Sequence, residues 1–408
     1  MAEVLTGSRA APPELSEAPR DACAACGAAG GLHVATIRGV PTNSCLMFPT
    51  FEAARAWPRG DIELLFCEAC GLIANRAARA ELTEYSGRYE PTQGWSPAFR
   101  RYHRGLAERI AAAVPLAGRH VVEVGCGQGE FLHLLCGLGG ATGTGFDPCL
   151  DTARGDVVEQ RAEGVRLIGD FFSAASAQAL RADLLVCKMT LEHIPAVGRF
   201  AALCAEVARR SRPGMRVFIQ VPESLRILRD IAFEDIYYEH VNYFTAASLR
   251  ALFARHGFAA EQVFTDYGGQ YVGLLARHAG EPAAPGEAGE LAEQRSLCRH
   301  FAEARAARIA QWRDAVAQAG RVVVWGSGSK GVTFLGALEA MAGRVSHVVD
   351  INPHRQGMHM AGSGHPIVGP AALHDIRPDT VIVMNRVYVE EVGASLAALG
   401  LAPRLLTL

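Results

Sequence analysis

The segment Ile236-Tyr237-Tyr238-Glu239-His240 brings a phenol, a carboxylate and an imidazole together within four residues. The imidazole of His240 titrates near neutral pH and can take a proton from a substrate, and the carboxylate of Glu239 can fix its tautomer. These residue types indicate acid–base chemistry. An aromatic strand edge with a hydrogen-bonded histidine gives the same pattern, so the segment alone leaves both interpretations open.

A glycine-rich loop, Glu123-Val-Gly125-Cys-Gly127-Gln-Gly129, follows a short apolar run. Glycines at such a place let the backbone approach a ligand closely, and the N-terminus of the following helix favours negative charge. A dinucleotide site has the spacing G-x-G-x-x-G, whereas this loop has G-x-G-x-G with an acid two residues before it. The loop resembles motif I of the class I S-adenosylmethionine methyltransferases, with NAD or a ligand-free turn as the alternatives.

This resemblance implies positions for the rest of a methyl-donor site. Asp147 ends the next predicted strand, where a carboxylate can accept from both ribose hydroxyls. Asp170 and Phe171 would lie beside the adenine ring, with Asp170 accepting from its amino group. Lys188 begins the loop Lys188-Met-Thr-Leu-Glu-His193, which would face the methyl donor.

Two C-x-x-C pairs, Cys23-Ala-Ala-Cys26 and Cys67-Glu-Ala-Cys70, are each followed by glycine. Four thiolates from two tight turns suit the tetrahedral coordination of Zn²⁺, and four protein ligands leave no open position for catalysis. The sequence therefore predicts a structural zinc site, with unmetallated cysteines or a redox pair as the alternative. Cys45 lies between the pairs and is not expected to be a ligand.

A second glycine loop, Gly326-Ser-Gly328-Ser-Lys330-Gly331, follows the apolar run RVVVW, and Asp350 ends the next run. This spacing matches the dinucleotide fingerprint better than the first loop does. A glycine loop with a lysine also suits a phosphate group, and a tight structural turn uses the same residues. A phosphate of the substrate, NAD(P) and a turn without ligand are therefore three open alternatives.

The elements around these loops predict an α/β architecture. Apolar runs at 121–125, 141–146, 183–187 and 216–221 alternate with helical patterns, as in a buried parallel sheet. Runs at 321–325, 345–350 and 379–385 predict a second, smaller α/β unit. Between the two units a helix is expected at about 288–319, interrupted at Arg305 but with a buried stripe formed by Cys298, Ala302, Ala306, Ile309, Trp312 and Val316.

Length and composition indicate a globular chain of several domains. The 408 residues suggest two to three domains, which we expect to be a zinc-binding module at 1–80 with a disordered start to about Ala22, a donor-binding domain at 81–283 and a C-terminal Rossmann-like domain at 284–408. A net charge of −2 argues against a nucleic-acid partner. The sequence contains no long apolar segment and no signal peptide, which predicts a cytoplasmic chain without membrane contact.

The chain also resembles a known family, the sugar C-methyltransferases that branch nucleotide-linked keto-deoxyhexoses. Its segment IYYEHVNYF is similar to the family signature I-Y-H-E-H-x-x-Y-F, and the order of a four-cysteine module, a methyl-donor domain and a C-terminal domain with a G-x-G-x-K-G loop is the same. The resemblance runs from about residue 20 to the end. It implies an S-adenosylmethionine-dependent enzyme with structural zinc that acts on a small nucleotide-activated keto-sugar, as a monomer or homodimer.

The family pattern carries over residue by residue. Tyr237, Glu239 and His240 match its active-site triplet, and His193 matches its histidine after the fourth strand. In the family the imidazole removes a proton beside the keto group, and the enolate attacks the donor methyl; a phenol such as Tyr237 can stabilise the oxyanion. The implied substrate contacts are Lys330 in the second loop, Asn385 at the end of a neighbouring strand and Tyr89 in a segment that covers donor and substrate.

Two positions depart from the family pattern. Tyr238 replaces its usual first histidine, and Met189 stands where the sugar enzymes have asparagine. Met189 leaves open a less polar acceptor. The alternatives are therefore C-, O- or N-methylation of another small molecule of the natural-product type and, less favoured by the net charge, methylation of RNA by a zinc-ribbon enzyme.

Overall fold

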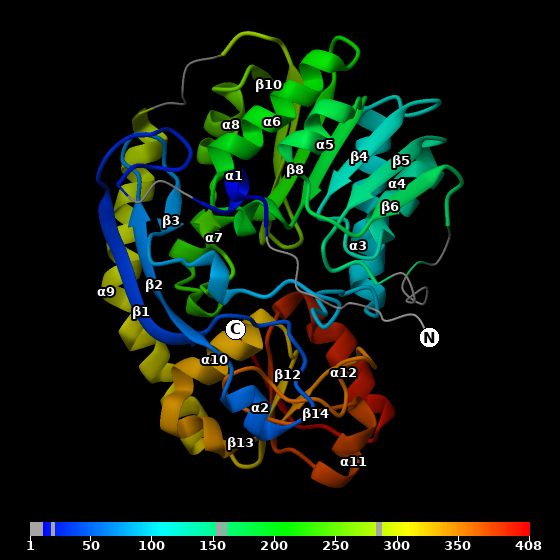
Figure 1. Ribbon diagram of the computed structural model, residues 1–408. Coiled ribbons are helices and arrows are strands. Elements are labelled where there is room, and N and C mark those ends of the chain that lie inside the picture. The colour runs from blue at the N-terminus through cyan, green and yellow to red at the C-terminus, as the bar shows by residue number, and fades with distance from the viewer. Residues whose placement is uncertain (1–10, 18–20, 152–157, 159–160, 283–287) are drawn as a thin grey trace.

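The structure is a computed structural model that describes residues 11–17, 21–151, 158, 161–282 and 288–408. These residues form three sheets, which lie at the left, the upper right and the bottom of Figure 1. Helices alternate with the strands of the seven-stranded and the five-stranded sheet, so the expected α/β fold class is confirmed. Within the described ranges, none of the helices combines the length and the apolar character needed to cross a membrane.

The N-terminal sheet is antiparallel, with the order β1-β2-β3-β9. Its strands are β1 (Leu32–Pro41), β2 (Arg59–Phe66), β3 (Ile73–Asn75) and β9 (Asn242–Tyr243), and the connections contain α2 (Phe51–Arg55) and the 3₁₀ turn η1 (Ala80–Leu82). Ile73 of β3 pairs with Tyr243 of β9. Because β9 directly follows residues 236–240, this pairing holds the acid–base segment against the cysteine module.

The central sheet has the order β10-β11-β8-β7-β4-β5-β6. Its strands are β4 (His120–Val124), β5 (Thr142–Phe146), β6 (Val165–Ile168), β7 (Leu184–Lys188), β8 (Arg216–Pro222), β10 (Phe258–Asp266) and β11 (Tyr271–His278). All neighbouring pairs are parallel except those that β11 forms with β8 and β10. The strand order reverses at β4, and ligands of open α/β sheets bind at the carboxyl ends of the strands beside such a reversal.

Alternate residues of the central strands face two separate cores. Val121 and Leu184 pack under α3 (Pro97–Ala113) and α4 (Glu130–Gly139), whereas Val122 and Leu185 pack on the opposite face. The helices on that face are α5 (Ala174–Ala179), α6 (Val197–Arg210) and α8 (Ala246–Ala254); α7 (Ser224–Arg229) and the 3₁₀ turns η2 (Leu191–His193) and η3 (Phe233–Asp235) lie in the connections. Burial of both faces explains the continuous apolar runs in these strands.

The C-terminal sheet is parallel, with the order β14-β13-β12-β15-β16. Its elements are β12 (Val322–Trp325), α10 (Ser329–Leu338), η4 (Glu339–Arg344), β13 (Val345–Val349), β14 (Ile367–Val368), η5 (Pro370–Ala372), α11 (Leu373–Ile376), β15 (Thr380–Val383), η6 (Arg386–Tyr388), α12 (Val389–Ala398) and β16 (Arg404–Thr407). The sequence predicted the three inner strands. It missed β14 and β16 because these edge strands are short or only partly buried.

The long helix α9 (Ala288–Gln318) agrees with the expected helix at 288–319. In Figure 1 it runs along the left side, beside β1 and down to the C-terminal sheet. The predicted stripe is wrong at Ala302 and Ala306, which are exposed, whereas Phe301 is buried and Arg305 is half-buried. A period of 3.6 residues from Cys298 passes through positions 301 and 305, so Arg305 belongs to the buried face.

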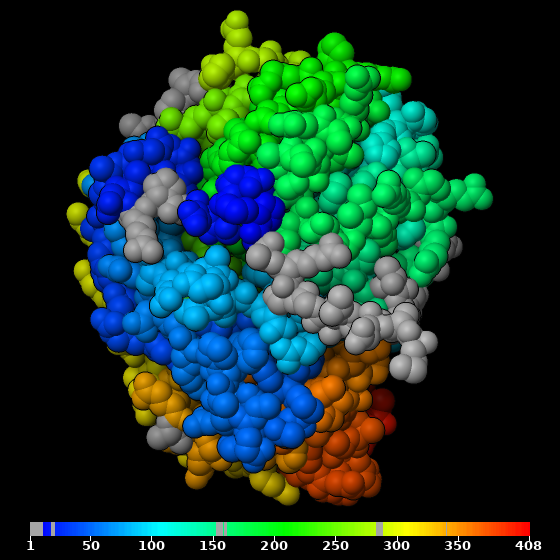
Figure 2. All heavy atoms as spheres, in the orientation of Figure 1, coloured from blue at the N-terminus to red at the C-terminus, as the bar shows by residue number. Residues whose placement is uncertain are grey.

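The predicted disorder up to Ala22 is wrong for residues 11–17. These residues include α1 (Pro13–Ser16), which packs against α6, with Leu15 buried. The backbone N–H of Ala174 donates to Oε1 of Glu14 at 3.1 Å, and Figure 2 shows this dark-blue segment lying on the central part of the chain. The prediction is also wrong at Ala22, which forms a bridge with Ala29. Residues 1–10 and 18–20 lie outside the described residues.

Candidate active site

One cavity of about 1630 Å³ lies between the three sheets. Both glycine loops, residues 237–240 and parts of the segment 89–96 line it. A cavity for one small ligand usually measures about 300–1,000 Å³, so this cavity has room for two. It brings together the predicted acid–base, donor and substrate residues, with the exception of Gly129 and Asp170.

The first glycine loop connects β4 to α4, and all three of its glycines have positive φ, at +75° for Gly125, +56° for Gly127 and +87° for Gly129. A Cβ on Gly125 would lie 1.9 Å from Oγ1 of Thr190, whereas a Cβ on Gly127 would meet no atom within 4 Å. Gly125 therefore allows the loop to pack on the segment after β7. Gly127 leaves open space in the cavity, and Gly129 begins α4.

Asp147 lies directly after β5 at the cavity wall. Its two carboxylate oxygens accept hydrogen bonds from the backbone N–H groups of Gly127 and Cys149, each at 2.7 Å. These bonds orient the carboxylate, and each oxygen keeps a lone pair for a ligand hydroxyl. Phe171 also lines the cavity, but Asp170 is exposed and accepts from the N–H of Phe171 at 2.9 Å.

Two buried charged groups lie beside the first loop. Burial raises the pKa of Glu123 to about 8, and the positive charge of Lys188 acts in the opposite direction. Burial in turn lowers the pKa of Lys188, whose Nζ lies 5.4 Å from the centre of the Phe131 ring. Within the described part of the chain, Oε2 of Glu123 has no hydrogen-bond partner. A buried carboxylate of this kind suits a cationic ligand because the two charges compensate each other.

The predicted base His240 is bonded to Tyr237, whose Oη lies 2.6 Å from Nε2 of the imidazole. His193, from η2, packs edge-on against His240 with the ring centres 4.8 Å apart, and its Nδ1 lies 3.1 Å from Oη of Tyr85. Burial lowers the pKa of His193 to about 4 and the pKa of His240 well below its ordinary 6.5. Both imidazoles are therefore neutral at pH 7, which a proton acceptor requires.

Glu239 is not bonded to His240, contrary to the expectation that it fixes the tautomer of this imidazole. Its carboxylate accepts from the N–H of Ser44 at 2.9 Å, from Oγ of Ser44 and from Nδ2 of Asn43 at 3.4 Å. Burial raises the pKa of Glu239 to about 7, while the hydrogen bonds from Ser44 oppose this rise. The two side chains are adjacent in sequence, but they leave the loop in different directions.

The carboxylate that faces His240 is that of Glu192, which was not among the predicted site residues. Its Oε1 lies 3.9 Å from Nε2 of His240, and the two side chains are 1% and 4% exposed. Neither oxygen of Glu192 has a hydrogen-bond partner among the described residues. Burial raises the pKa of Glu192 to about 8, although its own N–H and Lys188 act in the opposite direction. No local pattern marks Glu192, because its contact is with a segment 48 residues later in the chain.

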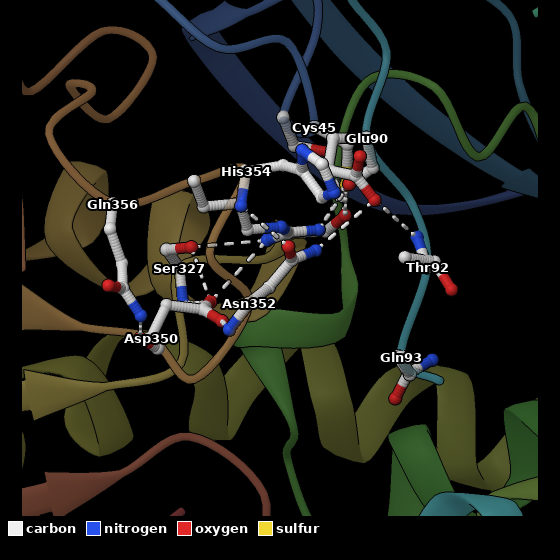
Figure 3. Close-up of polar contacts among 12 residues, drawn as sticks. Cys45, Glu90, Thr92, Gln93, Ser327, Asp350, Asn352, His354 and Gln356 are labelled. Atoms are coloured by element: carbon white, nitrogen blue, oxygen red, sulfur yellow. Dashed lines mark hydrogen bonds and ion pairs between the residues drawn. The ribbon is translucent and has the colours of Figure 1, made fainter. Parts of the chain in front are cut away.

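The second glycine loop connects β12 to α10, and Figure 3 shows its polar contacts. Asp350 accepts from the N–H of Ser327 at 3.0 Å and from its Oγ, and it lies 3.7 Å from the guanidinium of Arg355. Arg355 is buried and donates to the carbonyl oxygen of Glu90. Asn352 donates to the carboxylate of Glu90 at 3.2 Å. In a dinucleotide site Asp350 would contact a ribose. Here it contacts Ser327 and Arg355 instead, and Arg355 joins the loop to the segment around Glu90.

The predicted substrate residues Lys330 and Asn385 meet at one wall of the cavity. Nζ of Lys330 lies 3.1 Å from Oδ2 of Asp235 and donates to Oε1 of Gln270 at 3.0 Å. Nε2 of Gln270 donates to Oδ1 of Asn385 at 2.9 Å. An ammonium group has three N–H donors, so Lys330 keeps one for a ligand. Tyr89 also lines the cavity.

The two departures from the family signature occupy different surroundings. Tyr238 is buried against Gly60, and its Oη accepts from the N–H of Arg79 at 2.9 Å, so it belongs to the N-terminal sheet. Met189 lines the cavity, packs against the cluster of Phe99, Tyr267 and Tyr271 and has a φ of +53°. Methionine rarely adopts positive φ, which makes Met189 a strained apolar residue in the wall of the site.

The four predicted zinc ligands converge. Sγ of Cys23 lies 3.6 Å from that of Cys70, Sγ of Cys26 lies 3.6 Å from that of Cys67, and all four sulfur atoms lie within 4.8 Å of one another. A tetrahedron with Zn–S distances of about 2.3 Å has edges of about 3.8 Å, so these residues fit zinc. Cys45 is not part of this cluster, and its Sγ lies 3.6 Å from Oγ of Ser329.

Comparison with known proteins gives matches along most of the chain. The family model of a methyltransferase domain matches residues 97–263, and that of a C-methyltransferase C-terminal domain matches residues 289–401. The C-methyltransferase NovU of Streptomyces niveus is 26% identical over 396 residues, which covers 92% of this chain and 91% of NovU.

Two further matches cover the central part. The trans-aconitate 2-methyltransferase of Delftia acidovorans is 33% identical over 34% of this chain and 54% of its own length, so the chain spans about half of that relative. The solved structure of the 1,6-didemethyltoxoflavin-N1-methyltransferase of Burkholderia thailandensis, with bound S-adenosylhomocysteine, is 19% identical with a TM-score of 0.33. It covers 46% of this chain and 80% of that one.

Proposed function

Since the chain belongs to the S-adenosylmethionine-dependent C-methyltransferases, we propose that it methylates the carbon next to the keto group of a nucleotide-linked deoxysugar. The observation that carries this proposal is the single cavity that the first glycine loop, the His240–Tyr237 pair and the second glycine loop all line. Methylation at carbon needs a base beside the donor methyl group, and a nucleotide-linked acceptor needs a long space with polar contacts at its far end. We propose that 1–80 form the zinc-binding module, that 81–283 bind the donor and carry the base, and that 284–408 contribute to acceptor binding.

We assign the methyl donor to the first glycine loop. S-adenosylmethionine supplies an electrophilic methyl group on a positively charged sulfur. The open space at Gly127 accommodates the ligand backbone, Asp147 accepts from its ribose and Phe171 packs on its base. Glu123 offers a buried carboxyl beside Lys188, and a cationic donor bound next to it would favour the ionised form of this group.

We assign proton removal to His240. Its imidazole is neutral at pH 7 and can therefore accept a proton, because burial keeps its pKa well below 6.5. The phenol of Tyr237, 2.6 Å from Nε2, holds the ring and can donate to the oxyanion as charge develops on the substrate oxygen. His193 packs edge-on against the imidazole, with the ring centres 4.8 Å apart, and adds to its burial.

We assign the acceptor to the space between His240 and the C-terminal sheet. The remaining N–H of Lys330 and the polar group formed by Gln270 and Asn385 suit a diphosphate or its ribose. Met189 and Tyr271 form an apolar patch that suits the deoxygenated carbons of a deoxysugar. We further propose that the four cysteines hold a structural zinc ion.

The proposal is tested by proton exchange in D₂O with a nucleoside-diphosphate-linked keto-deoxyhexose as the probe. The wild-type protein should exchange the hydrogen next to the keto group without donor, and with a ¹³C-methyl donor the label should appear on that carbon. His240→Ala should lose both activities while it binds S-adenosylhomocysteine with unchanged affinity. A label on oxygen or nitrogen, without exchange at carbon, would refute the proposed chemistry.

A further inference from the structure

Glu192 is a buried carboxylate without any hydrogen-bond partner in the described part of the chain, and it lies beside the proposed base. Burying a carboxylate whose oxygens accept no hydrogen bond is costly, because the lost hydration is compensated only by nearby charge such as that of Lys188. Such a group persists where function uses it. Nε2 of His240 lies 3.9 Å from Oε1 of Glu192.

From this geometry we propose that Glu192 is the positioning carboxylate of the base and pairs with the imidazolium that His240 forms when it takes the substrate proton. The inference rests on the proposed function, which makes His240 the base. Glu192, and not Glu239, pairs with His240, because both oxygens of Glu239 already accept hydrogen bonds from Asn43 and Ser44.

Atoms and charge balance in the proposed step. The C–H bond next to the keto group breaks, its electron pair enters the enolate, and the proton forms an N–H bond on His240. The enolate carbon then bonds to the donor methyl, and the donor sulfur keeps the electrons of the broken C–S bond. The imidazolium left beside Glu192 is part of a neutral pair until it releases its proton to solvent. Without the carboxylate, the same positive charge would be buried alone, which disfavours proton transfer.

Several other ionisable groups act on Glu192. Lys188, from the end of β7, stabilises its charged form, and Tyr85, Cys187, Tyr237 and Tyr271 interact with it electrostatically. His193 is its neighbour in η2 and stays neutral because burial lowers its pKa to about 4. Lys188 is thus the cation that favours ionisation of Glu192 before the reaction begins. Since burial raises the pKa of Glu192 to about 8, its ionised fraction grows as the pH rises from 7 to 9.

The test compares Glu192→Gln with wild-type protein by two independent measurements. The first is the pH profile of proton exchange from the keto-deoxyhexose probe. We expect the wild-type rate to rise between pH 7 and pH 9, and the variant to be at least tenfold slower at pH 8.5 with a flat profile. Glu192→Asp should recover part of the rise, because it restores the charge. The matched control is Glu234→Gln, a buried carboxyl with a raised pKa that does not line the cavity.

The second measurement needs no activity. The ring nitrogen signals of His240, observed by NMR in histidine-labelled protein, should shift with a midpoint near pH 8 in wild type and in Glu234→Gln. They should lose this shift in Glu192→Gln, whose unchanged melting temperature would show that it is folded. An unchanged exchange profile and an unchanged His240 titration in Glu192→Gln overturn the inference alone. A wild-type protein that titrates as expected but exchanges no proton overturns the proposed function, and the base role of the pair with it.

Discussion

Alanine substitutions at Gly125 and Gly127 should separate the structural demand of the first glycine loop from its ligand demand. Both residues have positive φ, at +75° and +56°, where alanine costs roughly 1–2 kcal/mol. At Gly125 the new Cβ would also lie 1.9 Å from Oγ1 of Thr190, and such overpacking adds roughly 1–3 kcal/mol. At Gly127 the Cβ meets no atom within 4 Å, so only the backbone cost applies.

We therefore expect Gly125→Ala to melt several degrees below Gly127→Ala, at about 2–4 °C per kcal/mol for a domain of this size. Gly127→Ala should lose only the stability that the backbone cost removes, but it should also lose affinity for S-adenosylhomocysteine, because its methyl group enters the space proposed for the ligand. Differential scanning calorimetry and titration calorimetry measure the two effects. Equal melting temperatures of the two variants would refute the packing argument. Wild-type affinity of Gly127→Ala for S-adenosylhomocysteine would refute the assignment of the methyl donor to this loop.

Three further predictions concern zinc, pH and the second loop. Cys67→Ser, or a strong chelator, should lower the stability of the N-terminal module without changing affinity for S-adenosylhomocysteine, and zinc analysis that finds no metal in the native protein would contradict this. Because burial raises the pKa of Glu123 to about 8, the folded chain keeps a proton that the unfolded chain releases above about pH 4.5, and stability falls as the pH rises to 8. Glu123→Gln should therefore be more stable than the wild type by a few kcal/mol at pH 8 and about as stable at pH 4.5. Thermal melts at the two pH values measure this difference. Lys330→Arg should weaken binding of a nucleoside diphosphate, since a wide guanidinium does not fit between Asp235 and Gln270; unchanged affinity in calorimetry would return Lys330 to a structural role.

The features that could be predicted from the sequence are those with a local signal. The apolar runs of β4, β5, β7 and β8, the glycine loops and the helix α9 depend on periodicity and turn residues that lie close together in the chain. The convergence of the two cysteine pairs could be predicted because each C-x-x-C turn supplies two zinc ligands by itself. Edge strands such as β14 and β16 carry too little buried surface to produce such a pattern.

Features that arise from contacts between distant segments could not be predicted. The sequence favoured Glu239 as the partner of His240 because the two are adjacent, but adjacent residues in a loop point to different sides. Glu239 reaches Ser44, 195 residues earlier, and Glu192 reaches His240. In the same way, the spacing of the second loop left a dinucleotide site open, whereas Asp350 contacts Ser327 and Arg355.

These distant contacts explain why the proposed base requires all three sheets. The segment of His240 leads into β9, which pairs with β3 of the N-terminal sheet. Next to it, Glu239 bonds to Ser44, and Oγ of Ser44 lies 2.7 Å from Oγ of Ser329 in the second glycine loop. From the opposite side, η2 of the central sheet brings Glu192 and His193 against the imidazole. A shift of any one sheet would therefore move the imidazole relative to the first glycine loop. For this reason the cysteine module helps to set the position of the base.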